Sequence, residues 1–354
     1  MGEAGDIGVQ LQDQVQEAAV SGRKLALRGG GSKAFYGREI VGETLDLSGH
    51  RGVVSYEPTE LVLTARGATP LSEIEGLLQE HAQMLPFEPP HFGPASTIGG
   101  AIAAGLGGPR RPWGGAPRDL LLGVKLLDGK GQILRFGGEV MKNVAGYDLS
   151  RLMAGAMGVL GVLLEVSIKV LPAPPGEATL QFEADQRASR SILLKMLGKG
   201  VPISASYAYH GVLRVRLACG EERFQQVMKR YGGEKYDNRN DFWGRLKNQQ
   251  LDYFRDPAPL WRLSLPQAVQ IDFDQPSLNE WGGAQRWLLS KLPAEEIRAR
   301  LAAVGGHASL FRNGDRRCEV FQPLPQRLME IHRQLKQVFD PQSLFNPGRL
   351  YAGL

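Results

Sequence analysis

The chain has 354 residues, 42% of them hydrophobic and 22% charged, a length sufficient for two domains with separate cores. Its 42 basic and 37 acidic residues leave a net charge of +5, and the basic residues are dispersed rather than gathered among aromatic ones, which argues against nucleic-acid binding. Two cysteines, Cys219 and Cys318, are too few for a disulfide framework or for the four thiolates usual in an iron–sulfur cluster.

Helical and strand-like patterns alternate over the first 172 residues. Apolar residues at helical spacing predict a helix over residues 7–20 that ends at Gly22. Thr69 and Pro70 predict the start of a second helix, which ends before Pro86. Runs of apolar and β-branched residues predict seven strands, over residues 24–27, 45–47, 53–56, 61–65, 120–127, 132–136 and 160–170. The turn residues 128–131 join the fifth and sixth of these strands into a hairpin.

A proline-rich stretch, Pro172 to Gly176, can neither continue a sheet nor easily begin a helix, so it predicts a domain boundary. Beyond it, strands and helices mix in an α+β pattern. The predicted strands cover residues 203–209, 212–218 and 260–265, and the predicted helices cover 221–231, 242–251 and 293–304.

Three glycine-rich segments carry the strongest functional signal. They are residues 28–33 (RGGGSK), 97–105 (TIGGAIAAG) and 155–162 (GAMGVLGV). Glycines leave backbone N–H groups uncovered and tolerate positive φ, so several donors can converge on one anion. Ser32 and Lys33 add a hydroxyl and an ammonium to the first segment. Three such segments on one domain suggest a large phosphate-bearing cofactor.

Each segment also has a plainer interpretation. Residues 28–33 are compatible with a tight turn and a solvated lysine, and residues 97–105 with a small-residue helix packed on a sheet. Close strand packing would explain Gly158 and Gly161. The spacing matches neither the G-x-G-x-x-G fingerprint of a Rossmann fold nor a G-x-x-x-x-G-K-[ST] phosphate loop.

The order of these segments resembles a known family. RGGGSK, LDLS (45–48), PASTIGGAIAAGLGG (94–108), residues 146–172 and FNPGRL (345–350) are similar to the FAD-binding domain of the vanillyl-alcohol oxidase and p-cresol methylhydroxylase group. More narrowly, PRRPWGG (109–115), residues 136–153, WGGAQRWL (281–288) and the closing FNPGRLYAGL resemble the second flavin-type subunit of bacterial glycolate oxidase.

The resemblance implies an α+β fold: a two-subdomain FAD-binding domain of the p-cresol methylhydroxylase type with an inserted α+β cap domain. The FAD-binding domain covers residues 1–172, the cap domain covers 173–310, and residues 311–354 return to the FAD domain. Asp340-Pro341 resembles the helix end before that return, although a plain C-terminal turn at Asn346 stays open.

The resemblance also implies which residues bind FAD. The first segment would hold the pyrophosphate, the second would approach pyrophosphate and flavin after a turn fixed by Pro94, and the third would surround adenine and ribose. Lys142 would stabilise a reduced anionic flavin, although such polar residues also serve as caps or ion pairs. The predicted cofactor-binding residues are Arg28, Gly29, Gly30, Gly31, Ser32, Lys33, Pro94, Thr97, Ile98, Gly99, Gly100, Gly114, Arg118, Lys142, Asn143, Tyr147, Gly158, Gly161, Val162 and Asn346.

Two absences refine the expected chemistry. Relatives that attach the flavin covalently often carry a histidine where this chain has Ser32, which cannot alkylate the ring, so we expect non-covalent FAD. Similar 2-hydroxy-acid dehydrogenases usually carry paired histidine ligands for a metal in the cap, whereas the six histidines here show no close pair, so no metal is expected. The resemblance identifies no catalytic residue in this chain.

We therefore expect an FAD-binding subunit of a multi-subunit glycolate oxidase that converts glycolate to glyoxylate. It would transfer electrons or serve a structural role beside a second, catalytic FAD subunit and an iron–sulfur subunit, with residues 110–113 and 281–284 as candidate contact surfaces. One alternative is a self-sufficient FAD oxidoreductase that clamps a carboxylate with Arg110, Arg111 or Arg286. Another is a flavin-free assembly subunit. Acidic residues interrupt any early apolar run, so we expect a cytoplasmic protein, and membrane association through a partner stays open.

Overall fold

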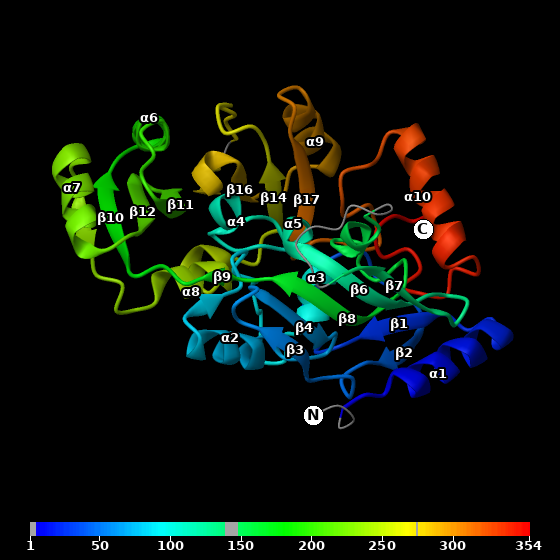
Figure 1. Ribbon diagram of the computed structural model, residues 1–354. Helices are drawn as coiled ribbons and strands as arrows, with labels where there is room; N and C mark the ends of the chain where they lie inside the picture. Colours follow the sequence, from blue (N-terminus) through cyan, green and yellow to red (C-terminus); the bar gives the residue numbers. More distant parts are fainter. Residues whose placement is uncertain (1–4, 139–147, 274) are drawn as a thin grey trace. The chain divides into compact units, whose positions relative to one another are not determined.

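The computed structural model describes residues 5–138, 148–273 and 275–354, and its chain divides into two compact units (Figure 1). The first unit comprises Met1–Gly107, Ala116–Pro172 and Arg316–Leu354, and the second comprises Gly108–Gly115 and Ala173–Asp315. The division falls at the proline-rich stretch and again at residue 315, close to the expected position 310. Residues 108–115, expected in the FAD domain, belong to the second unit.

The first unit begins with a small helix-and-strand layer. Helix α1 (Gly8–Ser21) ends at Gly22, whose left-handed backbone lets its N–H donate to the Ala18 carbonyl. Strands β1 (Leu25–Arg28) and β2 (Glu43–Asp46) pair in parallel. The apolar face of α1 packs on these strands, and Figure 1 shows them side by side. Leu344 and Phe345, from the C-terminal segment, complete this core.

A five-stranded antiparallel sheet forms the rest of the first unit, in the order β3-β4-β8-β6-β7. Its strands are β3 (Val53–Glu57), β4 (Val62–Arg66), β6 (Leu121–Leu127), β7 (Ile133–Gly137) and β8 (Val162–Lys169). Helices α2 (Leu71–Glu80) and α3 (Ile98–Ala104) bury Ile74, Leu78, Ile98 and Ile102 in the core of this sheet. Short elements complete it: β5 (Gln83–Met84), α5 (Pro117–Leu120), η1 (Ser150–Met153) and β9 (Leu171–Pro172). The strands and both helices predicted for residues 7–170 are confirmed, as is the β6-β7 hairpin.

The C-terminal segment is fixed by a buried ion pair. Helix α10 (Gln326–Phe339) carries Lys336 near its end, and the ammonium of Lys336 lies 2.7 Å from the carboxylate of Asp340. Lys336 also donates to the carbonyls of Val159 and Phe345, while Asp340 accepts from the amides of Leu344 and Phe345. The charges are therefore fully hydrogen-bonded, the condition under which a buried pair is tolerated.

The second unit is built on an eight-stranded antiparallel sheet in the order β13-β10-β12-β11-β15-β16-β14-β17. Its strands are β10 (Glu177–Glu183), β11 (Ile203–Tyr209), β12 (Val212–Ala218), β13 (Glu234–Tyr236), β14 (Leu260–Ser264), β15 (Leu278–Glu280), β16 (Gln285–Leu289) and β17 (His307–Arg312). Apolar residues of two helices, α6 (Gln186–Leu197) and α7 (Glu221–Tyr231), pack on β10, β11 and β12. The other elements are α4 (Arg111–Gly114), α8 (Phe242–Lys247), η2 (Asp252–Arg255), η3 (Trp281–Gly283) and α9 (Ala294–Ala302).

Two expectations for the second unit were wrong. Helix α8 ends at Lys247 rather than at residue 251, because Gln249 has a left-handed backbone with φ of 54°. Trp281 does not offer a contact surface: its side chain is 6% exposed, its indole N–H donates to the Gly108 carbonyl, and the Arg111 guanidinium stacks 4.7 Å from its ring. Both predicted contact segments thus meet inside the second unit.

Candidate functional site

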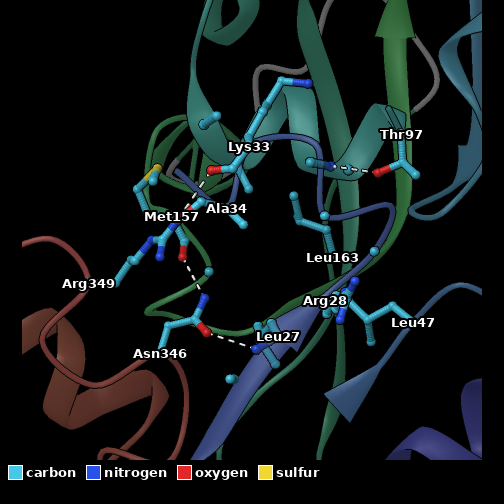
Figure 2. Close-up of a pocket in the computed structure, with 18 of the residues that line it drawn as sticks. Leu27, Arg28, Lys33, Ala34, Leu47, Thr97, Met157, Leu163, Asn346 and Arg349 are labelled. Atoms are coloured by element: carbon cyan, nitrogen blue, oxygen red, sulfur yellow. Dashed lines mark hydrogen bonds between the residues drawn. The ribbon is translucent and has the colours of Figure 1, made fainter. Parts of the chain in front are cut away.

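The first unit contains a cavity of about 590 Å³, at which all three glycine-rich segments and the C-terminal segment meet (Figure 2). The first segment contributes residues 28–33, the second Thr97, Gly99 and Gly100, and the third Gly158 and Gly161. Asn346 and Arg349 line it from the C-terminal segment, and Arg316 from the start of the last part of the unit. Segments far apart in the sequence therefore form one site.

The first segment presents open backbone donors. It follows β1 directly, and within the described residues no hydrogen bond uses the amide nitrogens of Gly29, Gly30 or Gly31. A Cβ on Gly30 would lie 1.4 Å from the Ala95 carbonyl oxygen, so the loop approaches the turn before α3 more closely than any side chain permits. The loop is thus held against the turn before α3, while its backbone N–H groups stay available to a ligand.

The second segment acts differently. Thr97 caps α3, since its hydroxyl accepts from the Gly100 amide at 3.2 Å, as Figure 2 shows. The amides of Ile98 and Gly99 donate to the carbonyls of Thr69 and Gly67. The first amides of this helix are therefore satisfied, and the segment contributes a surface without side chains rather than hydrogen-bond donors. Gly100 is exposed, and a Cβ there would meet only the Thr97 hydroxyl, at 3.1 Å.

Asn346 links the third segment to the first. Its side-chain oxygen accepts from the Leu27 amide at 2.8 Å, and its side-chain nitrogen donates to the Met157 carbonyl at 2.7 Å (Figure 2). Gly158 has a φ of 74°, and a Cβ there would lie 2.7 Å from the Asn346 amide nitrogen. Glycine at 158 is thus required by the approach of Asn346 to this wall of the cavity.

Cationic side chains predominate around the cavity. Arg28, Lys33, Arg316 and Arg349 line it, against one acidic side chain, Glu39. Arg349 donates to the carbonyls of Lys33, Ala34 and Arg38, and burial lowers its pKa to about 10. Arg316 donates to the carbonyls of Gly37 and Arg38. Two guanidinium groups therefore hold the loop that follows the first segment, and the cavity is suited to an anionic ligand.

Lys33 is a buried cation with neutral hydrogen-bond partners. Its ammonium lies 2.6 Å from the Ser96 hydroxyl, with the Ser32 hydroxyl at 3.4 Å and the His91 carbonyl at 3.5 Å. Burial lowers the pKa of Lys33 to about 8. The ammonium, expected to join the backbone donors of its own loop, bonds instead to the turn before α3.

Several predicted residues lie elsewhere. Ile98 and Val162 belong to the apolar cores, Pro94 is exposed in the turn before α3, and Gly114 is part of the second unit. The side chain of Arg118 is 69% exposed beside Asp119. Lys142, Asn143 and Tyr147 lie outside the described residues. Sequence reasoning missed other lining residues, among them Leu27, Glu39, Leu47, Ala103, Met157 and Arg316.

Two further observations concern the described part of the chain. No group of three or more histidine, cysteine or acidic side chains is placed there to hold a metal ion. No helix there combines the length and apolar character needed to cross a bilayer.

Comparison with known proteins defines the class. Residues 9–137 match the family described as FAD binding domain. The structure is similar to that of p-cresol methylhydroxylase with bound substrate, with a TM-score of 0.70 over 96% of this chain and 86% of that one. It is also similar to alkyldihydroxyacetonephosphate synthase, with a TM-score of 0.68 over 97% and 76%. Both are 14% identical in sequence, which shows the fold. The chain therefore contains an FAD-binding domain and has the fold of p-cresol methylhydroxylase.

A full-length relative defines the family. The chain is 47% identical over 350 residues to the glycolate oxidase subunit GlcE of Escherichia coli (strain K12), a match that spans 99% of each chain. The chain therefore belongs to the GlcE family of glycolate oxidase subunits. It is also 36% identical over 114 residues to the glycolate oxidase subunit GlcD of Bacillus subtilis (strain 168), a match that covers 32% of this chain and 24% of that one.

The residues at the cavity fit FAD. The free amides of residues 29–31 and the cationic lining match the two phosphates, and the surface without side chains at Gly99 and Gly100 permits close approach of a flat ring system. When bound, FAD supplies the capacity to accept and release electrons. The chain itself supplies a preformed cradle.

Replacement of Gly100 by valine should weaken FAD binding more than it weakens the fold. The Cβ meets only the Thr97 hydroxyl, which has to shift by a few tenths of an ångström, and the methyl groups would occupy the cavity. The added bulk displaces the ligand from this surface, and a loss of about 1.4 kcal/mol of binding free energy corresponds to about a tenfold rise in Kd. Flavin fluorescence titration and thermal melting of the same samples provide the measurement. Gly76→Val in α2, where nothing lies within 4 Å, is the matched control. Unchanged FAD affinity in Gly100→Val would show that the second segment serves packing alone.

FAD affinity should fall as the pH rises through about 8. The pKa of Lys33 is about 8 without ligand, so this positive charge is present at pH 7 and mostly lost at pH 9. Bound phosphates favour the protonated form, so binding above pH 8 takes up a proton and Kd rises, by about three- to tenfold. Lys33→Arg keeps its charge throughout this range and should bind FAD with a flat pH profile. An equal pH dependence in both proteins would assign the titration to another group.

Proposed function

We propose that this chain is the FAD-binding subunit of a glycolate oxidase complex that oxidises glycolate to glyoxylate. The observation that carries the proposal is the 47% identity to GlcE over 99% of both chains, because a match of that extent includes the cavity and the second unit together. The cavity agrees with it, since its open amides and cations suit a dianionic cofactor.

The proposed role is electron transfer or structural support rather than abstraction of the hydride. The three arginines considered for clamping a substrate carboxylate have partners in the second unit: Arg110 pairs with Glu177, and Arg111 stacks on Trp281. Arg286 donates to the carbonyls of Gly283, Val269 and Ile271. The described residues also hold no group of three or more histidine, cysteine or acidic side chains placed to bind a metal beside a substrate hydroxyl. These observations favour a partner subunit as the site of substrate oxidation.

The proposed partners are a GlcD-type flavin subunit and an iron–sulfur subunit. The partial similarity to GlcD supports a pair of related flavin subunits. The iron–sulfur subunit is proposed because two cysteines cannot supply the four thiolates of a cluster, so onward one-electron transfer needs another chain.

The FAD should be bound non-covalently, since Ser32 stands where covalent relatives often carry a histidine. Acid precipitation of the purified chain should leave the flavin in the supernatant. The denatured chain should show no flavin fluorescence on a gel, and fluorescence that stays with the band would contradict non-covalent binding.

The isolated, FAD-loaded chain should not be reduced by glycolate, whereas the complex with a GlcD-type subunit and an iron–sulfur subunit should be. Anaerobic stopped-flow absorbance near 450 nm measures both. A matched complex that carries this chain as the Gly100→Val variant shows whether its flavin takes part. Bleaching of the lone chain at a catalytic rate would make it a self-sufficient oxidoreductase. A purified chain without flavin absorbance, unchanged by added FAD, would instead indicate a flavin-free assembly subunit.

A further inference from the structure

A second, small cavity lies within the second unit, between helix α6 and the eight-stranded sheet. Its volume is about 30 Å³, two to three times the roughly 10–15 Å³ that one water requires. Helix α6 lines it with one face, because Gln186, Ser189, Arg190 and Leu193 recur at helical spacing. The sheet lines it with Ala208, Asn279 and Arg286, which stand opposite one another on β11, β15 and β16.

Arg286 forms the inner wall of this cavity. The residue is 3% exposed, and its guanidinium donates to the carbonyls of Gly283, Val269 and Ile271. A guanidinium has five N–H donors, so these three contacts fix its position without using all of them. The carbonyls are neutral, and they leave the positive charge of Arg286 without a carboxylate at hydrogen-bond distance among the described residues.

Arg190 brings a second positive charge to the same cavity. Its Nε is buried and has no hydrogen-bond partner within the described part of the chain. The charge of Arg190 contributes, after burial, to lowering the pKa of Arg286, whereas Asp272, which is exposed, raises it. No acidic side chain is among the described residues that line the cavity. Two cations thus face one small space in which the described lining residues place no compensating negative charge.

Neutral polar groups complete the lining. The Ser206 hydroxyl oxygen accepts a hydrogen bond from the Gly282 amide at 2.7 Å, so its own hydrogen is free to donate to another group. The side-chain oxygen of Asn279 lies 3.2 Å from the Ser277 hydroxyl, which directs its NH₂ group away from that contact. Both residues line the cavity, and each carries a hydrogen-bond donor that these contacts do not use.

We infer that this cavity is a binding site for a small monovalent anion, a halide or the carboxylate group of a small acid. The anion would accept N–H bonds from Arg190 and Arg286 and relieve their mutual repulsion. The volume admits an ion of that size and excludes a nucleotide or a sugar phosphate. Bound there, the anion would join α6 to β15 and β16. The inference is independent of FAD binding, because every lining residue belongs to the second unit.

The test uses the full chain in sodium HEPES buffer, titrated with sodium chloride or sodium formate. Thermal melting reports stabilisation by the anion, and broadening of the ³⁵Cl NMR line reports chloride exchange, with formate as competitor. Saturating FAD is present to occupy the cationic cavity of the first unit. Displacement of chloride by formate shows that the site accepts carboxylates, and broadening without displacement shows that it selects halides. Absence of both the broadening and the rise in melting temperature would overturn the inference.

Variants assign the signal to this cavity. Arg190→Gln should weaken apparent anion affinity by about tenfold or more, because it removes a charge-assisted donor. Arg187→Gln, an exposed arginine on the same helix, is the matched control and should behave as the wild type. Asn279→Asp places a carboxylate beside both arginines, so it should raise the melting temperature without added anion and abolish the response. Equal affinity in Arg190→Gln and Arg187→Gln, or destabilisation by Asn279→Asp, would overturn the inference.

Discussion

The side-chain amide of Asn346 is the contact on which the cofactor cavity depends. It joins the backbone at Leu27, directly before the first glycine-rich segment, to the backbone at Met157, within the third. The backbone N–H of Asn346 donates to the Leu25 carbonyl, and this bond holds the residue in place. The buried pair of Lys336 and Asp340 fixes the turn just before it. Two walls of the cavity are therefore set by a segment that lies 319 residues beyond Leu27 and 189 residues beyond Met157.

Charge and hydrogen bonding are divided among different groups at this cavity. Arg316 and Arg349 direct several N–H donors to carbonyls of residues 33–38, so they shape the loop while they contribute positive potential. The amides of residues 29–31 remain as directional donors. Such a division keeps the donors preorganised, since the cations that attract an anion do not have to move when it arrives.

Local patterns were sufficient to predict α1, α2 and the seven longer strands of the first unit, but they did not predict α10 or the short elements. Apolar periodicity marked α1 and β8, and turn residues marked the β6-β7 hairpin. They failed for β16, because this strand is buried on both faces and carries Gln285 and Arg286, so it shows no alternation. Local patterns also failed to predict strand β10 and helix α6, which follow the proline-rich boundary between the two units.

At the site, glycine clusters identified the segments but not the function of each glycine. Gly30 is required by the Ala95 carbonyl and Gly158 by Asn346, and these are tertiary contacts that no local pattern contains. Arg316 was missed for the same reason: it precedes the recognisable C-terminal motif and reaches the cavity through the carbonyls of Gly37 and Arg38. By contrast, the FNPGR motif pointed to Asn346 through its resemblance to the C-terminal return of the family.

The interleaved order of the two units has a consequence for how the protein is made. On a ribosome, the glycine-rich segments emerge first, and the larger part of the second unit, residues 173–315, follows before residues 316–354 appear. At about 5–20 residues per second, roughly 10–40 s separate the synthesis of Gly161 from that of Asn346. During that interval the nascent chain lacks the wall that Asn346 and Arg349 provide. The cavity proposed to bind FAD is therefore completed late in biogenesis, and a chain that ends before residue 346 lacks this wall.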